Sequence, residues 1–179
     1  MLFRSISIIA ASALITTALL SVGASAQFIR NHNSKAPVSI SAANMDLLSR
    51  QDRVIASGNV VVSQGGLTIT ATRITGVYSD NGRIDVRRID ATGGVTIVKD
   101  DLRASSSTAI YDLDKDLITL LGNVRLKQGA NDLNGGRLVI DLNSGRSTIN
   151  SGGQNSVGGQ TQSSGGRITG TFSVPQRKN

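Results

Sequence analysis

Three segments of the chain repeat one pattern of alternating residues, with a glycine at the same central position. They are Val54-x-Ala56-x-Gly58-x-Val60-x-Val62, Ile89-x-Ala91-x-Gly93-x-Val95-x-Ile97 and Ile118-x-Leu120-x-Gly122-x-Val124-x-Leu126. Side chains on a β-strand alternate between its two faces, so each pattern places its apolar residues on one face. A glycine inside a strand costs packing and backbone entropy, so its return predicts a bend, a bulge or a close backbone approach. We therefore predict copies of one curved β unit, with the functional surface on the inner face.

A second apolar segment follows each pattern at a loosely regular spacing. Its equivalent positions, 40, 69, 102 and 133, are separated by 29, 33 and 31 residues. Turn-forming residues lie between the copies, as in Gln64-Gly65-Gly66, whereas helix signals are nearly absent after residue 30. The repeat predicts an all-β protein made of strand pairs of about thirty residues each.

The first 26 residues have the layout of an export signal. Arg4 supplies the positive charge, Ile6 to Leu20 form the apolar stretch, and Ala24-Ser25-Ala26 is a cleavage site. The alternative is an uncleaved membrane anchor, for which the apolar stretch is about long enough. Its Ser and Thr residues and the good cleavage site favour a cleaved signal, so we expect the mature chain to lie outside the cytoplasm.

The remaining residues divide into three parts by composition. We expect residues 27–37 to be a flexible segment, residues 38–149 to be the β domain, and residues 150–179 to be a flexible tail rich in Gly, Ser and Gln. Within the tail, residues 167–174 alternate again and predict an edge strand, with a frayed end as the alternative.

The chain has a formal net charge of +7 at pH 7. A basic balance indicates an anionic partner such as nucleic acid, a phosphate-bearing lipid or an anionic membrane surface, and export argues against nucleic acid. The plainer alternative is a soluble protein with scattered surface arginines. Because the chain has no cysteine, it has neither a lipoprotein acylation site nor a disulfide framework.

The residues that most enzymes use are scarce. His32 is the one histidine, and all twelve acidic residues are Asp, so zinc sites, His-dependent triads and Glu-based acid–base pairs are not expected. Asp112, Asp114 and Asp116 alternate as calcium ligands can, but Lys115 interrupts them and no closing carboxylate follows. We therefore predict no catalytic residues, no metal, no cofactor and no enzymatic activity.

Three phrases carry a resemblance to a known family. They are Val38-Ser39-Ile40-Ser41-Ala42-Ala43-Asn44-Met45, Ala56-Ser57-Gly58-Asn59-Val60-Val61-Val62-Ser63-Gln64-Gly65 and Leu120-Leu121-Gly122-Asn123-Val124-Arg125-Leu126-Lys127-Gln128-Gly129. With an apolar-Tyr-Asp segment between copies, the chain resembles the LptA/OstA-type periplasmic lipopolysaccharide-transport family. The middle copy departs from the pattern, with Gly93-Gly94-Val95 for Gly-Asn-Val and Lys99-Asp100 for Gln-Gly.

The resemblance implies a fold and a function. The implied fold is an open β-jellyroll, a V-shaped pair of antiparallel sheets whose slot holds the acyl chains of lipid A. Family members stack end to end, so the implied partners are lipopolysaccharide, inner-membrane and outer-membrane transport components, and further copies of the chain. The implied location is the periplasm.

Candidate lipid contacts follow from the two faces of the strands. Inward-facing apolar residues are expected to line the slot: Val38, Ile40, Val60, Val62, Ile69, Val95, Ile97, Leu102, Ile110, Val124, Leu126, Leu138 and Ile140. Basic residues are expected at a rim that orients the phosphorylated head group: Arg73, Arg87, Arg88, Arg103, Arg125 and Lys127. The alternative for the first set is ordinary core packing, and for the second it is a solvated outer face.

Two other readings remain open. A right-handed β-helix, as a structural or polysaccharide-binding protein, would also show copies of strands, although solenoid coils keep a tighter length. A membrane-anchored docking partner of the same superfold would retain residues 1–26. In an open jellyroll, residues 38–42 and 138–149 would be unpaired edges, so we predict head-to-tail association, with the 167–174 strand either joining the contact or covering the last edge.

Overall fold

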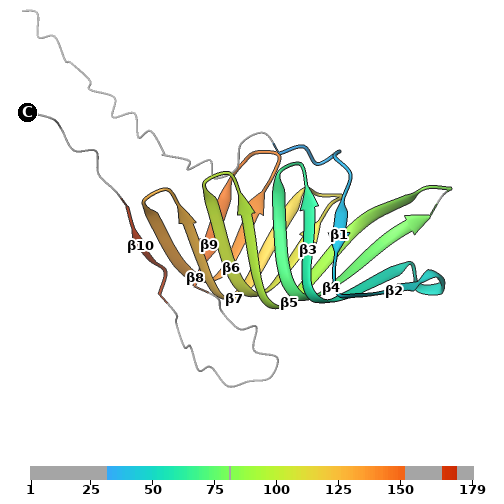
Figure 1. Cartoon of the computed structure of the whole chain (residues 1–179). Helices are drawn as coiled ribbons and strands as arrows, with labels where there is room; N and C mark the ends of the chain where they lie inside the picture. Colours follow the sequence, from blue (N-terminus) through green and yellow to red (C-terminus); the bar gives the residue numbers. More distant parts are fainter. Residues whose placement is uncertain (1–31, 81, 152–166, 173–179) are drawn as a thin grey trace, which may run out of the picture.

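The computed structural model describes residues 32–80, 82–151 and 167–172. These residues form one antiparallel sheet and a single short 3₁₀ turn, η1 (Ser49–Gln51). The strands are β1 (Ser39–Ser41), β2 (Asn44–Leu48), β3 (Arg53–Gln64), β4 (Leu67–Asp80), β5 (Ile84–Lys99), β6 (Leu102–Asp112), β7 (Leu117–Gln128), β8 (Asn131–Asp141), β9 (Ser147–Asn150) and β10 (Thr169–Thr171). The all-β, open-jellyroll prediction is confirmed (Figure 1). Among the helices of these described ranges, none has the length and apolarity to cross a membrane.

The strands follow one another across the sheet in the order β1-β3-β4-β5-β6-β7-β8-β10, with β2 also on β3 and β9 also on β8. Every pair is antiparallel. Coils of a β-helix stack in parallel, so the β-helix alternative is wrong. Tight turns between consecutive strands produce the antiparallel pairing. Gly65 and Gly66, with φ of +53° and +82°, form the β3–β4 turn. Asp100 is the first residue of the β5–β6 turn and Gly129 that of the β7–β8 turn, with φ of +52° and +55°.

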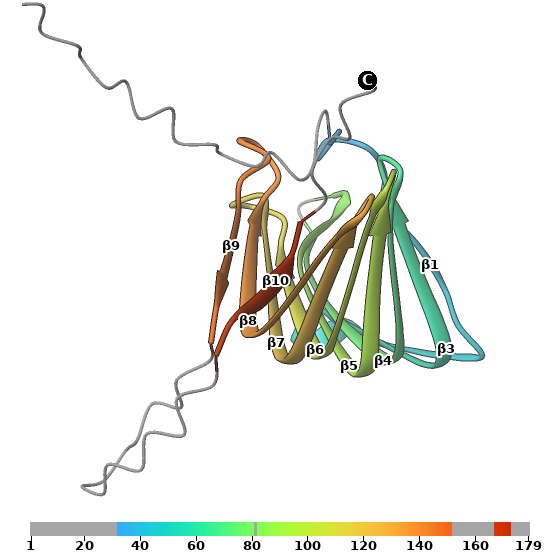
Figure 2. The ribbon, with the colours of Figure 1, turned by 90° about the vertical axis from the view of Figure 1, so that its left-hand side faces the viewer.

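The recurring glycine positions bend the sheet into a V. Paired residues there have positive φ: Gly58 and Asn59 (+82° and +46°), Gly93 and Gly94 (+85° and +79°), Gly122 and Asn123 (+77° and +50°). Glycine and asparagine are the residues that tolerate this conformation best, which explains the Gly-Asn and Gly-Gly phrases of the sequence. Each doublet gives its strand one residue more than the strands it faces, as in a β-bulge. One such bulge in each of β3, β5 and β7 divides the sheet into two walls (Figure 2).

The two walls are defined by residue ranges on either side of the bulges. Wall I contains residues 53–57, 73–80, 84–92, 108–112, 117–121 and 137–141, with β2 and β9. Wall II contains residues 60–64, 67–71, 95–99, 102–106, 124–128 and 131–135, with β1 and β10.

The inner faces of both walls belong to a single hydrophobic cluster. In β3 and β7 the inward positions keep one parity along the whole strand, as the repeated pattern predicts, and in β5 they do so from Ile89 to Lys99. Before Ile89, a small bulge at Arg87 shifts the parity and places Val86 on the inner side. In β4, β6 and β8, which lack the extra residue, the inward positions are three residues apart at the bend, at Ala71 and Ile74, Ser106 and Ala109, and Gly135 and Leu138. Strict alternation of inward and outward residues therefore fails at the bend in β4, β6 and β8.

Candidate functional site

The predicted slot residues largely pack against one another. Ten of them are no more than 2% exposed: Val60, Val62, Ile69, Val95, Ile97, Leu102, Val124, Leu126, Leu138 and Ile140. Val38 and Ile40 are partly buried at one end of the same cluster. The inner face is thus a predominantly apolar surface across wall II and wall I, with Gln64, Lys99 and Ser106 as buried polar residues, and the two walls close on each other along it.

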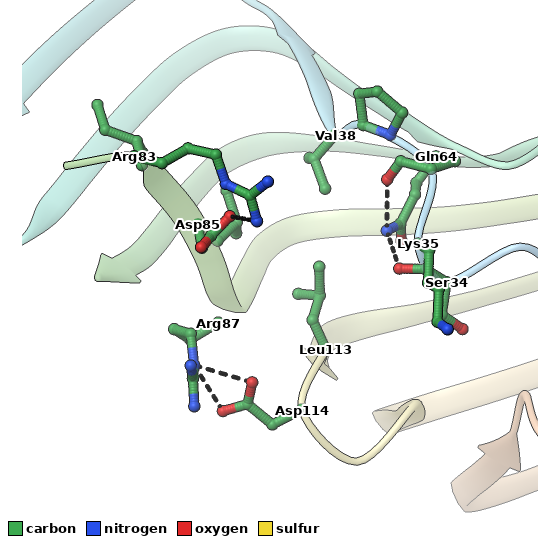
Figure 3. A pocket seen from close by; sticks show the side chains of 13 residues that line it. Ser34, Lys35, Val38, Gln64, Arg83, Asp85, Arg87, Leu113 and Asp114 are labelled. Atoms are coloured by element: carbon green, nitrogen blue, oxygen red, sulfur yellow. Dashed lines mark hydrogen bonds and ion pairs between the residues drawn. The ribbon is translucent and has the colours of Figure 1, made fainter. Parts of the chain in front are cut away.

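An open cavity of about 690 Å³ lies at the mouth of the V. One side is formed by residues 34–38 and Gln64 of wall II, and the other by residues 83–87 and by Leu113 and Asp114 at the outer end of wall I (Figure 3). The lining is mixed: Val38, Ile84, Val86 and Leu113 are apolar, whereas Lys35, Arg83 and Arg87 are cations, two of them paired with Asp85 and Asp114 at 2.8 Å. Apolar surface beside cations suits an amphiphile with an anionic head.

Residues 32–38, which we call the strap, cross the mouth and connect the two walls. Gln64 of wall II donates from Nε2 to the carbonyl oxygens of Ser34 (2.9 Å) and Ala36 (3.0 Å). Tyr111 of wall I donates its hydroxyl to Gln64 Oε1 at 2.7 Å, and His32 Nε2 lies 3.2 Å from the same hydroxyl. Residues 27–37 are predicted from the sequence to be a flexible segment, and residues 32–37 lie against the sheet.

Comparison with known proteins identifies the family. Residues 39–146 match the sequence family described as LptA/(LptD N-terminal domain) LPS transport protein. The chain belongs to this family. An uncharacterized protein of Rhizobium meliloti (strain 1021) is 26% identical over 120 residues, a match spanning 63% of this chain and 64% of that protein, so the chain spans just under two thirds of that relative's length.

A solved structure shares the fold. LptH, the LptA homologous periplasmic component of the lipopolysaccharide transport device of Pseudomonas aeruginosa, matches with a TM-score of 0.67 at 17% identity, over 80% of this chain and 100% of that chain. The likeness shows that this member of the LptA/LptD N-terminal family has the LptA-like jellyroll.

The structure places one predicted slot residue, Ile110, on the outer face of the sheet, so its assignment to the slot is wrong. Ile110 pairs with Asp90 and Thr119 on the outer face of wall I, between the buried Ala109 and Tyr111. Strict alternation from Leu102 through β6 would place Ile110 on the inner face. The three-residue step from Ser106 to Ala109 shifts the inward positions to odd numbers, so Ile110 points outward.

The predicted rim cations do not gather at one rim. Arg87 lines the mouth cavity, where it is the extra residue of a small bulge opposite Val77 and Tyr78. The other five lie at outward positions of the sheet: Arg73, Arg88, Arg103, Arg125 and Lys127. These five side chains therefore do not line a rim of the V: the bend of β4 turns Arg73 outward, and the other four face outward by ordinary alternation beside inward residues.

Buried polar groups on the inner face were not predicted from the sequence. Gln64 and Lys99 are 4% and 6% exposed, and each stands two residues beyond the last apolar residue of its ladder, on the inner face. The available signal was a polar residue at the next inward position of each ladder, since Gln128 follows Leu126 in the same way. The sequence places Tyr111 in a repeated apolar-Tyr-Asp segment and His32 in the predicted flexible segment, and neither position indicates their contact with each other. Within the described ranges, no three His, Cys, Asp or Glu side chains come together as metal ligands.

The strap should respond to mild acid through His32. Burial lowers the pKa of His32 from its ordinary value of 6.5, and the nearby Lys99 ammonium lowers it further, against smaller opposing effects of Gln64 and Asp116. The folded protein therefore favours the neutral form of the His32 imidazole. The stabilisation that neutral His32 gives to the strap is present above pH 6.5 and is lost as the pH falls below that value. Lowering the pH from about 7.5 to about 5.5 is expected to reduce amide-exchange protection of the strap relative to that of β7.

His32→Gln provides the control for this pH effect. Glutamine keeps a polar group near the Tyr111 hydroxyl without titrating, so strap protection in this variant should be the same at both pH values. Equal loss of protection in the variant and the natural chain would assign the effect to another group.

Proposed function

We propose that the protein is a periplasmic lipopolysaccharide-binding transport protein that shields lipid A acyl chains between its two walls and joins a bridge between the inner and outer membranes. The observation that carries this proposal is the predominantly apolar inner face, which is continuous from β1 to β9. An acyl chain laid along that face would meet mainly apolar side chains, and the sheet would curve around it on both sides. Family membership supports the lipopolysaccharide class of cargo.

Apolar contact is strong enough to carry such a function. Burial of one methylene contributes about 0.8 kcal/mol, so ten methylenes contribute about 8 kcal/mol before ordering costs. Exposed charge pairs contribute only about 0 to 1 kcal/mol each. The inner face would therefore set the affinity, and the cations of the mouth would orient the head group.

The mouth cavity is the proposed entrance. Acyl chains can reach the closed inner face only if the walls separate, and the Tyr111–Gln64–Ser34 chain of hydrogen bonds joins them at the mouth. Hydrogen bonds of this kind contribute about 1 kcal/mol each, and bound acyl chains would replace the apolar contacts that the walls lose on separating. Arg87 and Lys35 would then face the phosphates of the head group, and Val38, Ile84 and Leu113 the first methylenes.

Bridge formation would use the sheet edges. The first edge is formed by β1 and β2 and the last by β9 and β10, and both present backbone groups that a further strand can pair with. Partners at these edges would be transport components of either membrane or a second copy of the chain. The proposed role requires no chemical step, in keeping with the prediction that the protein is not an enzyme.

Photocrosslinking tests the binding site. A benzophenone amino acid in place of Ile84, 56% exposed at the mouth, should crosslink to added purified lipopolysaccharide, because the acyl chains would pass it. The matched control is the same replacement at Ile110, on the outer face of the same wall, which should crosslink little. Equal crosslinking at both positions would indicate adsorption to the surface, and no crosslinking at either would contradict the proposal. Mass spectrometry of lipid co-purified with the full chain gives the identity of the cargo.

A further inference from the structure

The charged residues on the outer face of wall II gather toward its β8–β10 end. In β1, β3, β4 and β5 the outward positions of this wall are neutral: Ser39, Ser41, Val61, Ser63, Thr68, Thr70, Thr96 and Val98. In β6 and β7 they include Arg103, Arg125 and Lys127, all of which are exposed. We call these three residues, together with the exposed Arg167, the basic patch.

Arg167 joins the patch from the tail of the chain. β10 pairs with residues 132–134 of β8, and Thr169 lies opposite the outward-facing Asn134 (Figure 2). Arg167 stands two residues before Thr169 and therefore has the same outward parity. Arg125 and Arg167 line a hollow of about 460 Å³, whose other lining residues are neutral. An anionic group in this hollow would meet two guanidinium groups and no carboxylate of the lining.

The outer faces of the two walls pair their charges differently. In wall I, Arg88 lies directly opposite Asp112 and forms an ion pair with Asp90 at 2.8 Å. In wall II, Arg103 lies directly opposite Lys127, and like charges at directly opposed positions destabilise a sheet. The fold alone gives no reason for this second arrangement, whereas an anionic partner would relieve the repulsion.

Acidic residues neutralise only part of the patch. Lys127 pairs with Asp132 at 3.4 Å, and their side chains remain 62% and 39% exposed. The other three cations of the patch form no ion pair within the ranges that the structure describes. Asp100 and Asp101 lie in the β5–β6 turn, beyond the outer end of the strands. Four cations and one carboxylate thus leave these sheet positions with a net charge of +3.

The patch lacks the apolar anchors of a protein–protein interface. In the described part of the chain, no large exposed apolar side chain lies on the outer face of wall II. Those of wall I are Met45, Leu47, Ile84 and Leu121, and those with inward parity beside β10 are Ile168 and Phe172. Protein partners are held mainly by buried aromatic and Arg side chains that fill pockets. A surface that offers many phosphates over a broad area needs no such anchor.

We infer that the outer face of wall II is a docking surface for an anionic phospholipid membrane, with the basic patch against the lipid phosphates. Each Lys or Arg close to such a membrane strengthens partitioning by about fivefold. The patch lies on the opposite side of wall II from the hydrophobic cluster, so the contact does not use the inner face. The protein would therefore stay near a membrane whether or not cargo is bound.

Vesicle co-sedimentation tests the inference on protein purified from the periplasm. The protein should partition onto vesicles of phosphatidylcholine mixed with phosphatidylglycerol, and much less onto phosphatidylcholine alone. Raising the salt from about 0.1 M to about 1 M should abolish binding, because the screening length falls from about 10 Å to about 3 Å. The vesicles contain no lipopolysaccharide, so the result is independent of cargo binding.

Two double variants of equal charge locate the surface. Arg103→Gln with Arg125→Gln should lower the partition coefficient by at least about tenfold, because both cations belong to the patch. Arg73→Gln with Arg137→Gln removes the same charge from the outer face of wall I and should lower it by less than about twofold. The first variant should unfold at the same or a slightly higher urea concentration than the natural protein, because the repulsion between Arg103 and Lys127 is relieved.

A fluorophore on a single cysteine reports which face meets the membrane. The chain has no cysteine, so Ser105→Cys in wall II and Thr119→Cys in wall I each provide one labelling site. Both residues are half-buried at outward positions, Ser105 opposite Arg125 and Thr119 opposite Ile110. A quencher on the lipid head groups should quench the label at position 105 and leave the label at position 119 unchanged.

Contrary results would overturn the inference in distinct ways. Equal losses of binding in the two double variants, or equal quenching of the two labels, would indicate attraction by net charge without a preferred face. Unchanged binding of the Arg103→Gln, Arg125→Gln variant would exclude the patch as the contact. Absence of binding to the anionic vesicles would exclude a lipid partner, and retention on immobilised polyglutamate would then assign the patch to an acidic protein. Photocrosslinking at Ile84 reports separately on lipopolysaccharide binding.

Discussion

Val60→Asp is expected to abolish stable folding. Val60 is 0% exposed on the inner face at the start of wall II, where it faces Ala71 across the strands and lies inside the single core cluster. A carboxylate at that place has no partner, so the substitution should lower the free energy of unfolding by more than about 4 kcal/mol. Such a loss is a large part of the roughly 5–15 kcal/mol by which domains are stable. Urea unfolding followed by circular dichroism measures it.

Ser63→Asp is the matched control, three residues along the same strand. Ser63 is exposed on the outer face, and the new carboxylate would be solvated there. The free energy of unfolding should therefore change by no more than about 0.5 kcal/mol. If both variants unfolded at the urea concentration of the natural chain, the walls would be open to water in solution rather than closed on each other. That outcome would also change the proposed entry of lipid, because no separation of walls would be needed.

Gly93→Ala is expected to cause the second largest loss, by preventing the bend of β5. Gly93 has a φ of +85°, and an added Cβ would stand 2.6 Å from Thr72 Cβ and 2.8 Å from its Oγ1. Thr72 cannot swing away, since its Cβ is fixed to the backbone and its hydroxyl donates to the Gly93 carbonyl at 2.6 Å. The positive φ costs about 1–2 kcal/mol and the crowding about 1–3 kcal/mol, so a loss of roughly 2–5 kcal/mol is expected in urea unfolding.

Gly94→Ala separates the two causes. Gly94 has a similar φ of +79°, but nothing lies within 4 Å of its added Cβ, so only the backbone cost applies. Gly94→Asn should cost less still, because Asn59 and Asn123 occupy the same place in the other two bends. Equal losses for Gly93→Ala and Gly94→Ala would contradict the close approach of Thr72 to the bend.

The sequence predicted those parts of the fold that depend on one strand at a time. The ladders of β3, β5 and β7 and their turns follow from alternation and from Gly, Asn and Asp, and the apolar residues of all three ladders point inward. Ile110 was misplaced because its direction depends on a register relation with β5 and β7, and a bulge in a neighbouring strand leaves no mark in β6 itself. The same reason explains Arg73, which lies directly beside the bend of β4.

The apolar character of the site could be predicted from the sequence, but the arrangement of the two walls around it could not. Apolar residues at inward positions could be recognised from period-two alternation, but whether two inner faces enclose a slot or close on each other depends on the angle between the walls. The Tyr111–Gln64 contact joins residues 47 apart in sequence across that angle, so no local pattern could reveal it. Gln64 could have been noticed as a polar residue at an inward position.

The Gly-Asn and Gly-Gly doublets place the bend of the V in alternate long strands, β3, β5 and β7. The strands between them, β4, β6 and β8, carry no doublet and follow the bend of the neighbours with which they pair. All six strands contribute a segment to each wall, so the number of strand pairs sets the length of the V, whereas the doublets set its angle. Further strand pairs of the same kind would lengthen the V without requiring a new kind of bend.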